Sequence, residues 1–349
     1  MIVAVIMAGG KGERFWPKSR ETNPKQCLKI ISNRSMVEET IERLKPLFSK
    51  KDIYISTNEK LAKHIRKTLP NVNYVIEPIA KDTAAAIGLS ASYITKKQGD
   101  AIMFIETTDH TYKSKNEYLK HVKFAIDLAN ENYIVLIGIK PTEPHTGFGY
   151  IQKGKPVKVN KIKAYKIRRF KEKPDIKTAK VFFKSGEYLW NSGMFVSKCS
   201  VMLEAIKKHM PELYLALRKI KKNNFNKKIA KKEFKNLKKV SIDYGVMEKA
   251  KNTIVIEANM KWDDIGDWRA MERIHQKDKD WNVVIGKHFG LNTKNCIIWG
   301  DNLVATYDIK DLIIVSTKDS VMVIPKNRAQ KVKELVEEMK KNKRFKKYL

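Results

Sequence analysis

A run of glycines and basic residues directly follows the first apolar segment of the chain. Residues 2–7 are all apolar, and Ala8-Gly9-Gly10-Lys11-Gly12-Glu13-Arg14 comes next. Glycines after a buried strand let backbone N–H groups approach a phosphate, and basic side chains supply counter-charge. The run lacks the Gly-Lys-Ser/Thr ending of a Walker loop and the third glycine of a dinucleotide-binding turn. By itself it therefore predicts either a phosphate-binding turn or an ordinary tight turn.

A second group with chemical potential is Thr107-Thr108-Asp109-His110, which follows the apolar run 101–105. If that run is a strand of an open α/β sheet, the Asp109 carboxylate lies at the usual ligand crevice. His110 could be proposed as a nucleophile or a general base. We expect a structural or substrate-positioning role for it, because direct attack on a phosphate needs no enzyme nucleophile.

The elements that must position these residues alternate between strand and helix patterns. Strand-like runs rich in Ile and Val occupy 2–7, 53–56, 101–105 and 133–138. Between them, Ser35–Glu38 and Ser114–Glu117 are capping boxes, each followed by apolar residues at helical spacing. This alternation predicts an α/β fold with a doubly wound sheet.

From about Asn282 onward the pattern changes to short β-like runs with little helix between them. The runs are 283–285, 296–299, 303–307, 312–316 and 321–324. They predict a small β-rich domain over 281–349, after a catalytic domain over 1–280. One amphipathic helix is expected to end it, with Val332, Leu335, Val336 and Met339 on the apolar face. The lysine-rich segment 340–347 is expected to be frayed and solvated.

The composition excludes some classes of protein. The three cysteines are far apart, so they predict neither a zinc knuckle nor a disulfide framework. No apolar run approaches the roughly 18 to 20 residues that a membrane span needs, and residues 2–7 read as a buried strand. We therefore expect a cytoplasmic protein with no membrane partner. The net charge of +33 could indicate nucleic-acid binding. We expect instead a lysine-rich solvated surface, because no nucleic-acid-binding motif accompanies the charge.

The stretch from Gly9 to Lys25 resembles the signature of nucleotide-sugar pyrophosphorylases, which is Gly-x-Gly-x-Arg followed by Pro and later by Pro-Lys. In that family the loop wraps the nucleotide phosphates. The resemblance implies that Arg14 and Lys25 neutralise the phosphates and that Ala8, Gly9, Gly10 and Gly12 contact the nucleotide. It also implies a Rossmann-like, doubly wound mixed sheet with a small β-rich C-terminal domain of partly left-handed β-helix character.

Further motifs resemble the mannose-1-phosphate guanylyltransferases in particular. Glu77-Pro78 with Asp82-Thr83-Ala84 is similar to the segment that meets guanine, and a carboxylate can accept from guanine N1–H and N2–H. Asp82 or Thr83 could equally cap the helix that starts near Ala84, and both roles can hold.

Three later segments resemble the segments that bind the sugar in this family. Pro144–Ile151 is similar to a stretch whose glycines, Gly147 and Gly149, would let the backbone lie against the sugar. In the Glu-Lys-Pro motif, Glu172 can accept from sugar hydroxyls and Lys173 can hold the sugar phosphate. Asn191, in Trp190–Phe195, would bind the sugar.

The motif Trp-x-Asp-x-Gly, found here from Trp262 to Gly266, completes the resemblance. It implies that Asp109 and Asp264 are the two Mg²⁺ ligands, a pair that phosphate oxygens and water would complete. Asp263 and Asp267 are expected to face solvent or to cap the following helix.

The resemblance implies transfer of GMP from GTP to mannose 1-phosphate by in-line displacement. The catalytic set would be Arg14, Lys25, Lys173, Asp109 and Asp264. The family often dimerises, so a homodimer is an expectation, whereas phosphomannose isomerase activity is not expected. The alternatives are a related enzyme for another sugar or nucleotide and a catalytically silent GDP-mannose-binding paralogue.

Overall fold

The computed structural model describes residues 1–157 and 163–349. Its contacts divide the chain into two compact units. Unit 1 contains Met1–Gly9, Thr40–Thr108 and Tyr112–Trp262, and unit 2 contains Gly10–Glu39, Asp109–Thr111 and Asp263–Leu349. Each unit therefore joins segments that are far apart in sequence. The predicted domain boundary near residue 280 divides the chain at one point, whereas each unit is made of several segments. That boundary therefore stays a prediction.

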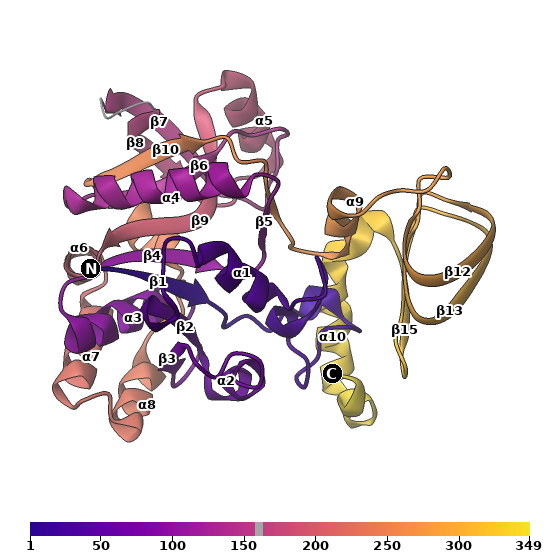
Figure 1. Cartoon of the computed structure of the whole chain (residues 1–349), viewed down its shortest axis with the longest axis horizontal. Helices are drawn as coiled ribbons and strands as arrows, with labels where there is room; N and C mark the ends of the chain where they lie inside the picture. The colour runs from indigo at the N-terminus through magenta and orange to yellow at the C-terminus, as the bar shows by residue number, and fades with distance from the viewer. Residues whose placement is uncertain (158–162) are drawn as a thin grey trace. The chain divides into compact units, whose positions relative to one another are not determined.

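Unit 1 is built on a mixed sheet (Figure 1). Its strands are β1 Ile2–Met7, β2 Ile53–Asn58, β3 Asn73–Glu77, β4 Ile102–Thr107, β6 Ile134–Ile139, β7 Tyr150–Val157, β8 Ala164–Lys171, β9 Tyr188–Lys198 and β10 Thr253–Ala258. The order across the sheet is β3-β2-β1-β4-β9-β6-β10-β8-β7. The strands from β3 to β4 run parallel, and β9 pairs antiparallel with both β4 and β6. These observations confirm the predicted α/β class and its mixed sheet.

Helices cover both faces of this sheet. They are α2 Glu59–Ile65, α3 Thr83–Gln98, α4 Lys115–Asn130, α5 Ile176–Ser185, α6 Cys199–His209, α7 Pro211–Lys222 and α8 Lys227–Asn236, and the residues of α1 Met36–Leu44 are divided between the two units. Side chains of β4 alternate between the faces. Phe104 packs against Tyr118 of α4, whereas Met103 and Ile105 join a core with α3, α6 and α7. The capping box predicted at Ser35 forms with both of its bonds at α1, and at α4 the Ser114 hydroxyl caps the helix by accepting from the Glu117 N–H.

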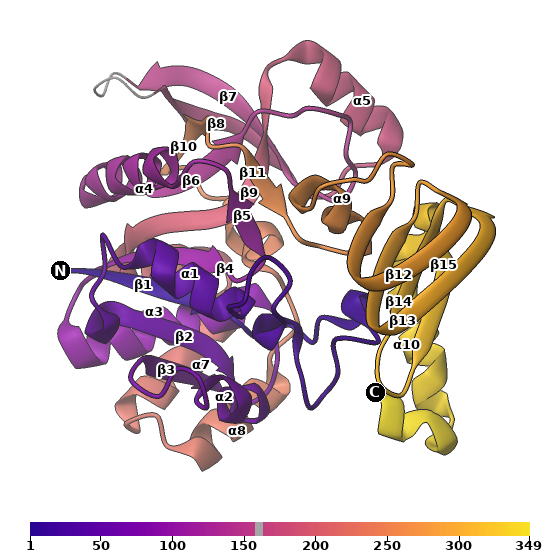
Figure 2. The ribbon, with the colours of Figure 1, turned by 45° about the vertical axis from the view of Figure 1, so that its right-hand side comes forward.

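Unit 2 contains four strands, over residues 283–325, that wind into a coil and are called the β-rich coil (Figure 2). Its elements are β12 Val283–Lys294, β13 Ile297–Lys310, β14 Leu312–Ser316, β15 Val321–Pro325, the short helix α9 Met271–Ile274 and α10 Val332–Lys341. The strands β12, β13 and β14 pair in parallel, and β15 returns antiparallel to β14. Asn292 and Asp308 have left-handed backbone angles and hydrogen-bond to each other, so equivalent corners of the coil stack. The predicted β-rich C-terminal domain is thus confirmed.

Three details of that prediction are wrong. The runs 296–299 and 303–307 belong to one continuous strand, β13, because the coil bends without ending its pairing. Leu335 is 40% exposed, since α10 turns only Val332, Val336 and Met339 toward the core of unit 2. The lysine-rich tail is not frayed. Lys343–Tyr348 form a 3₁₀ helix, and the Leu349 carbonyl accepts from the Glu21 N–H.

Within the described residues, no helix combines the length and the apolar character needed to cross a membrane.

Candidate active site

The glycine-rich turn of unit 2 lies directly against the segment that carries Lys25. Gly12 has a φ of 69°, and a β-carbon there would clash with Cβ of Lys25. The turn is also tied by hydrogen bonds, because Gln26 Nε2 donates to the Gly10 carbonyl at 2.7 Å and Ser19 Oγ donates to the Gly12 carbonyl at 2.6 Å. Only glycine fits this close approach.

Lys25 lies on Asp109. Its ammonium is 2.8 Å from Asp109 Oδ2 and also donates to the carbonyl of Ile265. The Lys25 side chain is only 10% exposed. The resemblance assigns Lys25 to the nucleotide phosphates. In this structure Lys25 donates instead to Asp109, one of the two predicted metal ligands, and to the backbone carbonyl next to Asp264, the other predicted ligand.

Asp109 and Asp264 are brought together by two short strands. β5 (His110–Tyr112) pairs with β11 (Trp262–Asp264), and the Ile265 N–H donates to the Asp109 carbonyl at 2.8 Å. Burial and, to a lesser degree, the Asp109 charge raise the pKa of Asp264 to about 7, against the opposing effect of Lys25. The two carboxylates therefore repel each other strongly when both are ionised.

This repulsion shows whether the two aspartates are suited to hold a metal ion. A divalent cation between Asp109 and Asp264 would remove the unfavourable charge pairing that Lys25 only partly offsets. In the described parts of the chain no group of three or more His, Cys, Asp or Glu could hold a metal. A pair of carboxylates suffices for a cation that takes its other ligands from phosphates and water. The residues fit a divalent metal ion, which nucleotidyl transferases generally use.

Of the two neighbouring acidic residues, Asp267 caps the following helix as predicted, whereas Asp263 forms an ion pair instead. Asp267 accepts from the Arg269 N–H at 2.8 Å and so caps the turn after β11. Asp263 pairs with the guanidinium of Arg273. His110 is buried, with 4% of its surface exposed.

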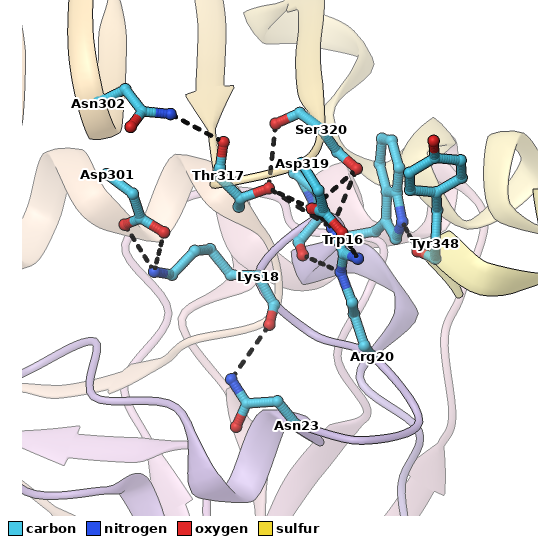
Figure 3. A network of polar contacts seen from close by, with 11 residues as sticks. Trp16, Lys18, Arg20, Asn23, Asp301, Asn302, Thr317, Asp319, Ser320 and Tyr348 are labelled. Carbon is cyan, nitrogen blue, oxygen red and sulfur yellow. Dashed lines mark hydrogen bonds and ion pairs between the residues drawn. The ribbon is translucent and has the colours of Figure 1, made fainter.

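The loop between Arg14 and Lys25 is anchored to the β-rich coil of unit 2 (Figure 3). Both guanidinium NH₂ groups of Arg20 contact the Asp319 carboxylate, at 2.6 and 2.7 Å, and one also donates to Ser320 Oγ. Lys18 pairs with Asp301 at 2.9 Å, and Trp16 Nε1 donates to the Tyr348 carbonyl at 2.8 Å. The coil therefore fixes the loop between two residues predicted to be catalytic. Arg14 itself is exposed.

Packed aromatic rings also hold this loop in place. Phe15 packs on Trp268 with ring centroids 5.3 Å apart, and Trp268 packs edge-on against Trp299 of β13 at 5.6 Å. The Trp268 indole N–H donates to the Trp16 carbonyl at 3.1 Å. The Lys25 ammonium lies 5.1 Å above the Phe15 ring. Burial of these rings stabilises the loop in one conformation.

The predicted guanine segment lies in unit 1. Glu77 ends β3, is 7% exposed, and has its Oε1 3.3 Å from the place where a β-carbon on Gly9 would lie. Burial raises the pKa of Glu77 to about 7, helped by the Asp82 charge. Asp82 caps α3 by accepting from the Thr83 N–H at 2.8 Å, which confirms the capping alternative. Thr83 Oγ1 accepts from the Ile242 N–H at 2.8 Å.

The predicted sugar-side residues also gather in unit 1. A β-carbon on Gly149 would clash with Oε2 of Glu172 and lie 3.2 Å from Cβ of Asn191. The Asn191 N–H donates to the Gly149 carbonyl at 2.7 Å. Lys173 donates to Glu172 Oε1 at 2.7 Å. Burial alone would lower the pKa of Lys173, but the hydrogen bond and the charge of Glu172, together with the charge of Asp243, outweigh burial and raise it. Gly147 is exposed, beside the stacked rings of His145 and Phe148.

The sequence alone did not reveal several residues that contact the predicted sugar residues or anchor the loop between Arg14 and Lys25. Asp243 accepts from the Asn191 side chain at 2.8 Å, but Ser241-Ile242-Asp243 follows no strand and contains no glycine turn. Arg20 and Asp319 lie 299 residues apart, so no spacing rule could pair them. The structure places the metal-side residues in unit 2 and the base- and sugar-side residues in unit 1.

Comparison with known proteins agrees with this chemistry. The nucleotidyl transferase model matches residues 3–280, and a MannoseP isomerase/GMP-like β-helix domain model matches 286–339. The chain is 37% identical to a mannose-1-phosphate guanylyltransferase of Klebsiella pneumoniae, over 99% of this chain and 75% of that protein. It is 33% identical to the xanthan biosynthesis protein XanB of Xanthomonas campestris pv. campestris (strain B100), over 97% of this chain and 73% of that protein.

A solved structure from Thermus thermophilus, named a mannose-1-phosphate geranyltransferase, superimposes with a TM-score of 0.89. It is 32% identical and covers 97% of this chain and 99% of its own. The match thus includes the catalytic core and the β-rich coil. The chain belongs to the nucleotidyl transferase family and, within it, to the group of the mannose-1-phosphate guanylyltransferases.

Proposed function

We propose that this protein transfers GMP from GTP to α-D-mannose 1-phosphate and releases GDP-mannose and pyrophosphate. The observation that carries the proposal is the cluster of Lys25, Asp109 and Asp264 against the glycine turn at Gly12. Two acids and one cation beside a phosphate-binding turn suit the handling of a metal–nucleotide complex. The names of the relatives supply the sugar and the base.

In the proposed reaction a phosphate oxygen of mannose 1-phosphate attacks the α-phosphorus of GTP. The bond from the α-phosphorus to the bridging oxygen breaks, and pyrophosphate leaves with that electron pair. Both reactants are anions, so catalysis consists mainly of positioning and charge neutralisation. Asp109 and Asp264 would hold Mg²⁺, which, when bound, screens the charge of the reacting phosphates.

The basic residues of the chain act on the same charges. Arg14 is exposed on the glycine turn and offsets charge on the triphosphate and the departing pyrophosphate. Lys25 limits the repulsion between the two aspartates and is close enough to meet phosphate oxygens brought to them. Lys173 aligns the sugar phosphate. Its backbone has a left-handed φ of 43°, a strained conformation of the kind often found at functional sites.

The neutral parts of the substrates are assigned to unit 1. Glu77, as a carboxylate, accepts from guanine N1–H and N2–H, and a side chain larger than glycine at position 9 would crowd its Oε1. Asp82 and Thr83 fix the start of α3 beside it. Glu172 and Asn191 bind sugar hydroxyls, and Gly147 and Gly149 let the backbone approach the ring.

The decisive experiment is an activity grid that combines GTP, ATP, UTP and dTTP with mannose, glucose and galactose 1-phosphates. Pyrophosphate release confined mainly to GTP with mannose 1-phosphate supports the proposal. A different preferred pair assigns the chain to a sibling activity. Absence of turnover with every pair, together with tight binding of GDP-mannose, identifies a silent binding protein instead.

Three further properties stay predictions. A cytoplasmic location is supported by three cysteines that are free thiols, of which Cys199 and Cys296 are buried. A homodimer can be tested by light scattering. Binding of nucleic acid is not proposed, and retention on DNA that depends on salt but not on sequence would reflect only the +33 charge.

A further inference from the structure

A π-helical turn, Asp243–Met247, reaches toward the predicted sugar residues at two points. At its start, Asp243 Oδ1 accepts from Asn191 Nδ2 at 2.8 Å. Just after its end, Glu248 Oε1 accepts from the Glu172 N–H at 3.1 Å. Turns of this kind are uncommon and are frequent at functional sites. The turn therefore holds Glu172 and Asn191, two of the four residues predicted to bind the sugar.

The orientation of the Asn191 amide is fixed by its other bond. Asn191 Oδ1 accepts from the Gly193 N–H at 3.1 Å, so its NH₂ group must point toward Asp243. The bond from Asn191 occupies one acceptor position of Asp243, at Oδ1. A carboxylate offers about four such positions on its two oxygens, so Asp243 has capacity to accept more.

The Glu172 carboxylate is a second, independent observation that points to a bound ligand. It is only 7% exposed, and its Oε1 is used by Lys173. Its Oε2 is buried, and among the residues that the structure describes no donor reaches it. A buried carboxylate oxygen without a donor is costly, and such atoms usually mark a ligand or water position. A β-carbon at Gly149 would clash with this oxygen, so glycine is what allows the Glu172 carboxylate to take this position.

The electrostatics select the class of ligand. Burial and, to a lesser degree, the Glu172 charge raise the pKa of Asp243 to about 7, although Lys173 and Asn191 act in the opposite direction. Two neighbouring carboxylates repel a phosphate, but they accept well from hydroxyl groups. A ring with several O–H donors and no negative charge of its own fits this position, and Lys173 beside it suits the attached phosphate.

We propose that Asp243 is a specificity-determining residue, which accepts hydrogen bonds from hydroxyls of the sugar ring together with Glu172. This inference rests on the proposed function, because it assigns Asp243 to the sugar of that reaction. Since acceptors at fixed positions penalise a sugar that turns a hydroxyl elsewhere, Asp243 contributes to the choice between epimers.

The test is Asp243→Asn, compared with wild type in the forward reaction. The asparagine oxygen can still accept from Asn191, so the pocket keeps its shape while one acceptor and one charge are lost. The expected result is a KM for mannose 1-phosphate raised by about tenfold or more, with the KM for GTP unchanged within about twofold. The ratio of kcat/KM for mannose 1-phosphate over glucose 1-phosphate should shift by about fivefold or more.

A structural role would give a different result, namely a lower melting temperature with both KM values or kcat affected alike. Asp100→Asn is the control, because the Asp100 carboxylate likewise accepts hydrogen bonds, here from the N–H and the hydroxyl of Ser200 on the exposed start of α6, and has no part in the proposed site. It should leave both KM values and the epimer ratio unchanged. Asp243→Ala, which removes both oxygens, should raise the KM for the sugar phosphate at least as much.

Two outcomes overturn the inference, and they differ from failure of the proposed function. An unchanged KM for mannose 1-phosphate and an unchanged epimer ratio in Asp243→Asn exclude a sugar contact. Equal changes in both KM values exclude a specific one. A wild-type protein that does not use mannose 1-phosphate at all overturns the proposed function itself, before any variant is compared.

Discussion

The Lys25 ammonium and the Asp109 carboxylate lie 2.8 Å apart, within the same compact unit and 84 residues apart in sequence. This pair joins the glycine turn to the predicted metal ligands, since Gly12 contacts Lys25 from the other side. A basic residue, two acids and a glycine turn thus form one cluster. The cluster leads to predictions that address each part separately.

Removal of either charged member should stop catalysis without unfolding the protein. Lys25→Ala and Asp264→Ala should each lower kcat by roughly 100-fold or more, because each removes charge stabilisation at the reacting phosphates. Steady-state kinetics and circular dichroism check the two halves of this claim. Asp263→Asn is the control, since Asp263 adjoins Asp264 but pairs with Arg273. Near-normal turnover in both alanine variants would refute the assigned roles.

Removal of metal should have a matching effect. Treatment with EDTA should abolish pyrophosphate release, and added Mg²⁺ should restore it, because without a cation the two aspartates add to the negative charge of the phosphates. In Asp109→Asn the Mg²⁺ concentration for half-maximal rate should rise by about tenfold or more, as expected for loss of one of two carboxylate ligands. Full activity in EDTA would contradict the metal assignment.

Glu77 should make nucleotide binding depend on pH. Its pKa of about 7 is raised by burial and by Asp82, so below pH 7 it is mostly protonated and loses acceptor capacity for guanine. Affinity for GDP should therefore increase as the pH rises from 6 to 8, as isothermal titration calorimetry can measure. In Glu77→Gln the affinity should be about tenfold lower at pH 8 and depend less on pH. UDP, which lacks guanine, is the control ligand. The same pH dependence in wild type and Glu77→Gln would exclude Glu77 as its source.

The contact between Arg20 and Asp319 should matter for turnover more than for stability. An ion pair with one partner 50% exposed contributes about 1 kcal/mol or less to folding. It does, however, fix the loop between Arg14 and Lys25, so Asp319→Ala should lower kcat several-fold while the melting temperature changes little. Lys341→Ala removes a comparable exposed pair with Glu338 on α10 and should leave kcat unchanged. Equal rates in both variants would show that the anchor is not needed.

Local patterns in the chain were enough to predict the class of the fold and the chemical character of the site. Apolar runs such as residues 2–7 must be buried, and capping boxes such as Ser35–Glu38 must start helices, because local composition and spacing decide both. The glycine turn and the acidic residues could be found for the same reason. Their motifs are contiguous, and each residue type has few alternative uses in that setting.

Which distant residues meet could be learned only from the packed fold. Asp109 lies beside the segment of Asp264 because β5 and β11 pair, and Arg20 meets Asp319 because the coil of β12–β15 packs on the loop. Asp243 approaches Asn191 through a π-helical turn that no local pattern predicts. Hydrogen bonds and ion pairs act over a few ångströms in space, whatever the separation along the chain. The partners of a charged side chain are therefore fixed by packing rather than by sequence order.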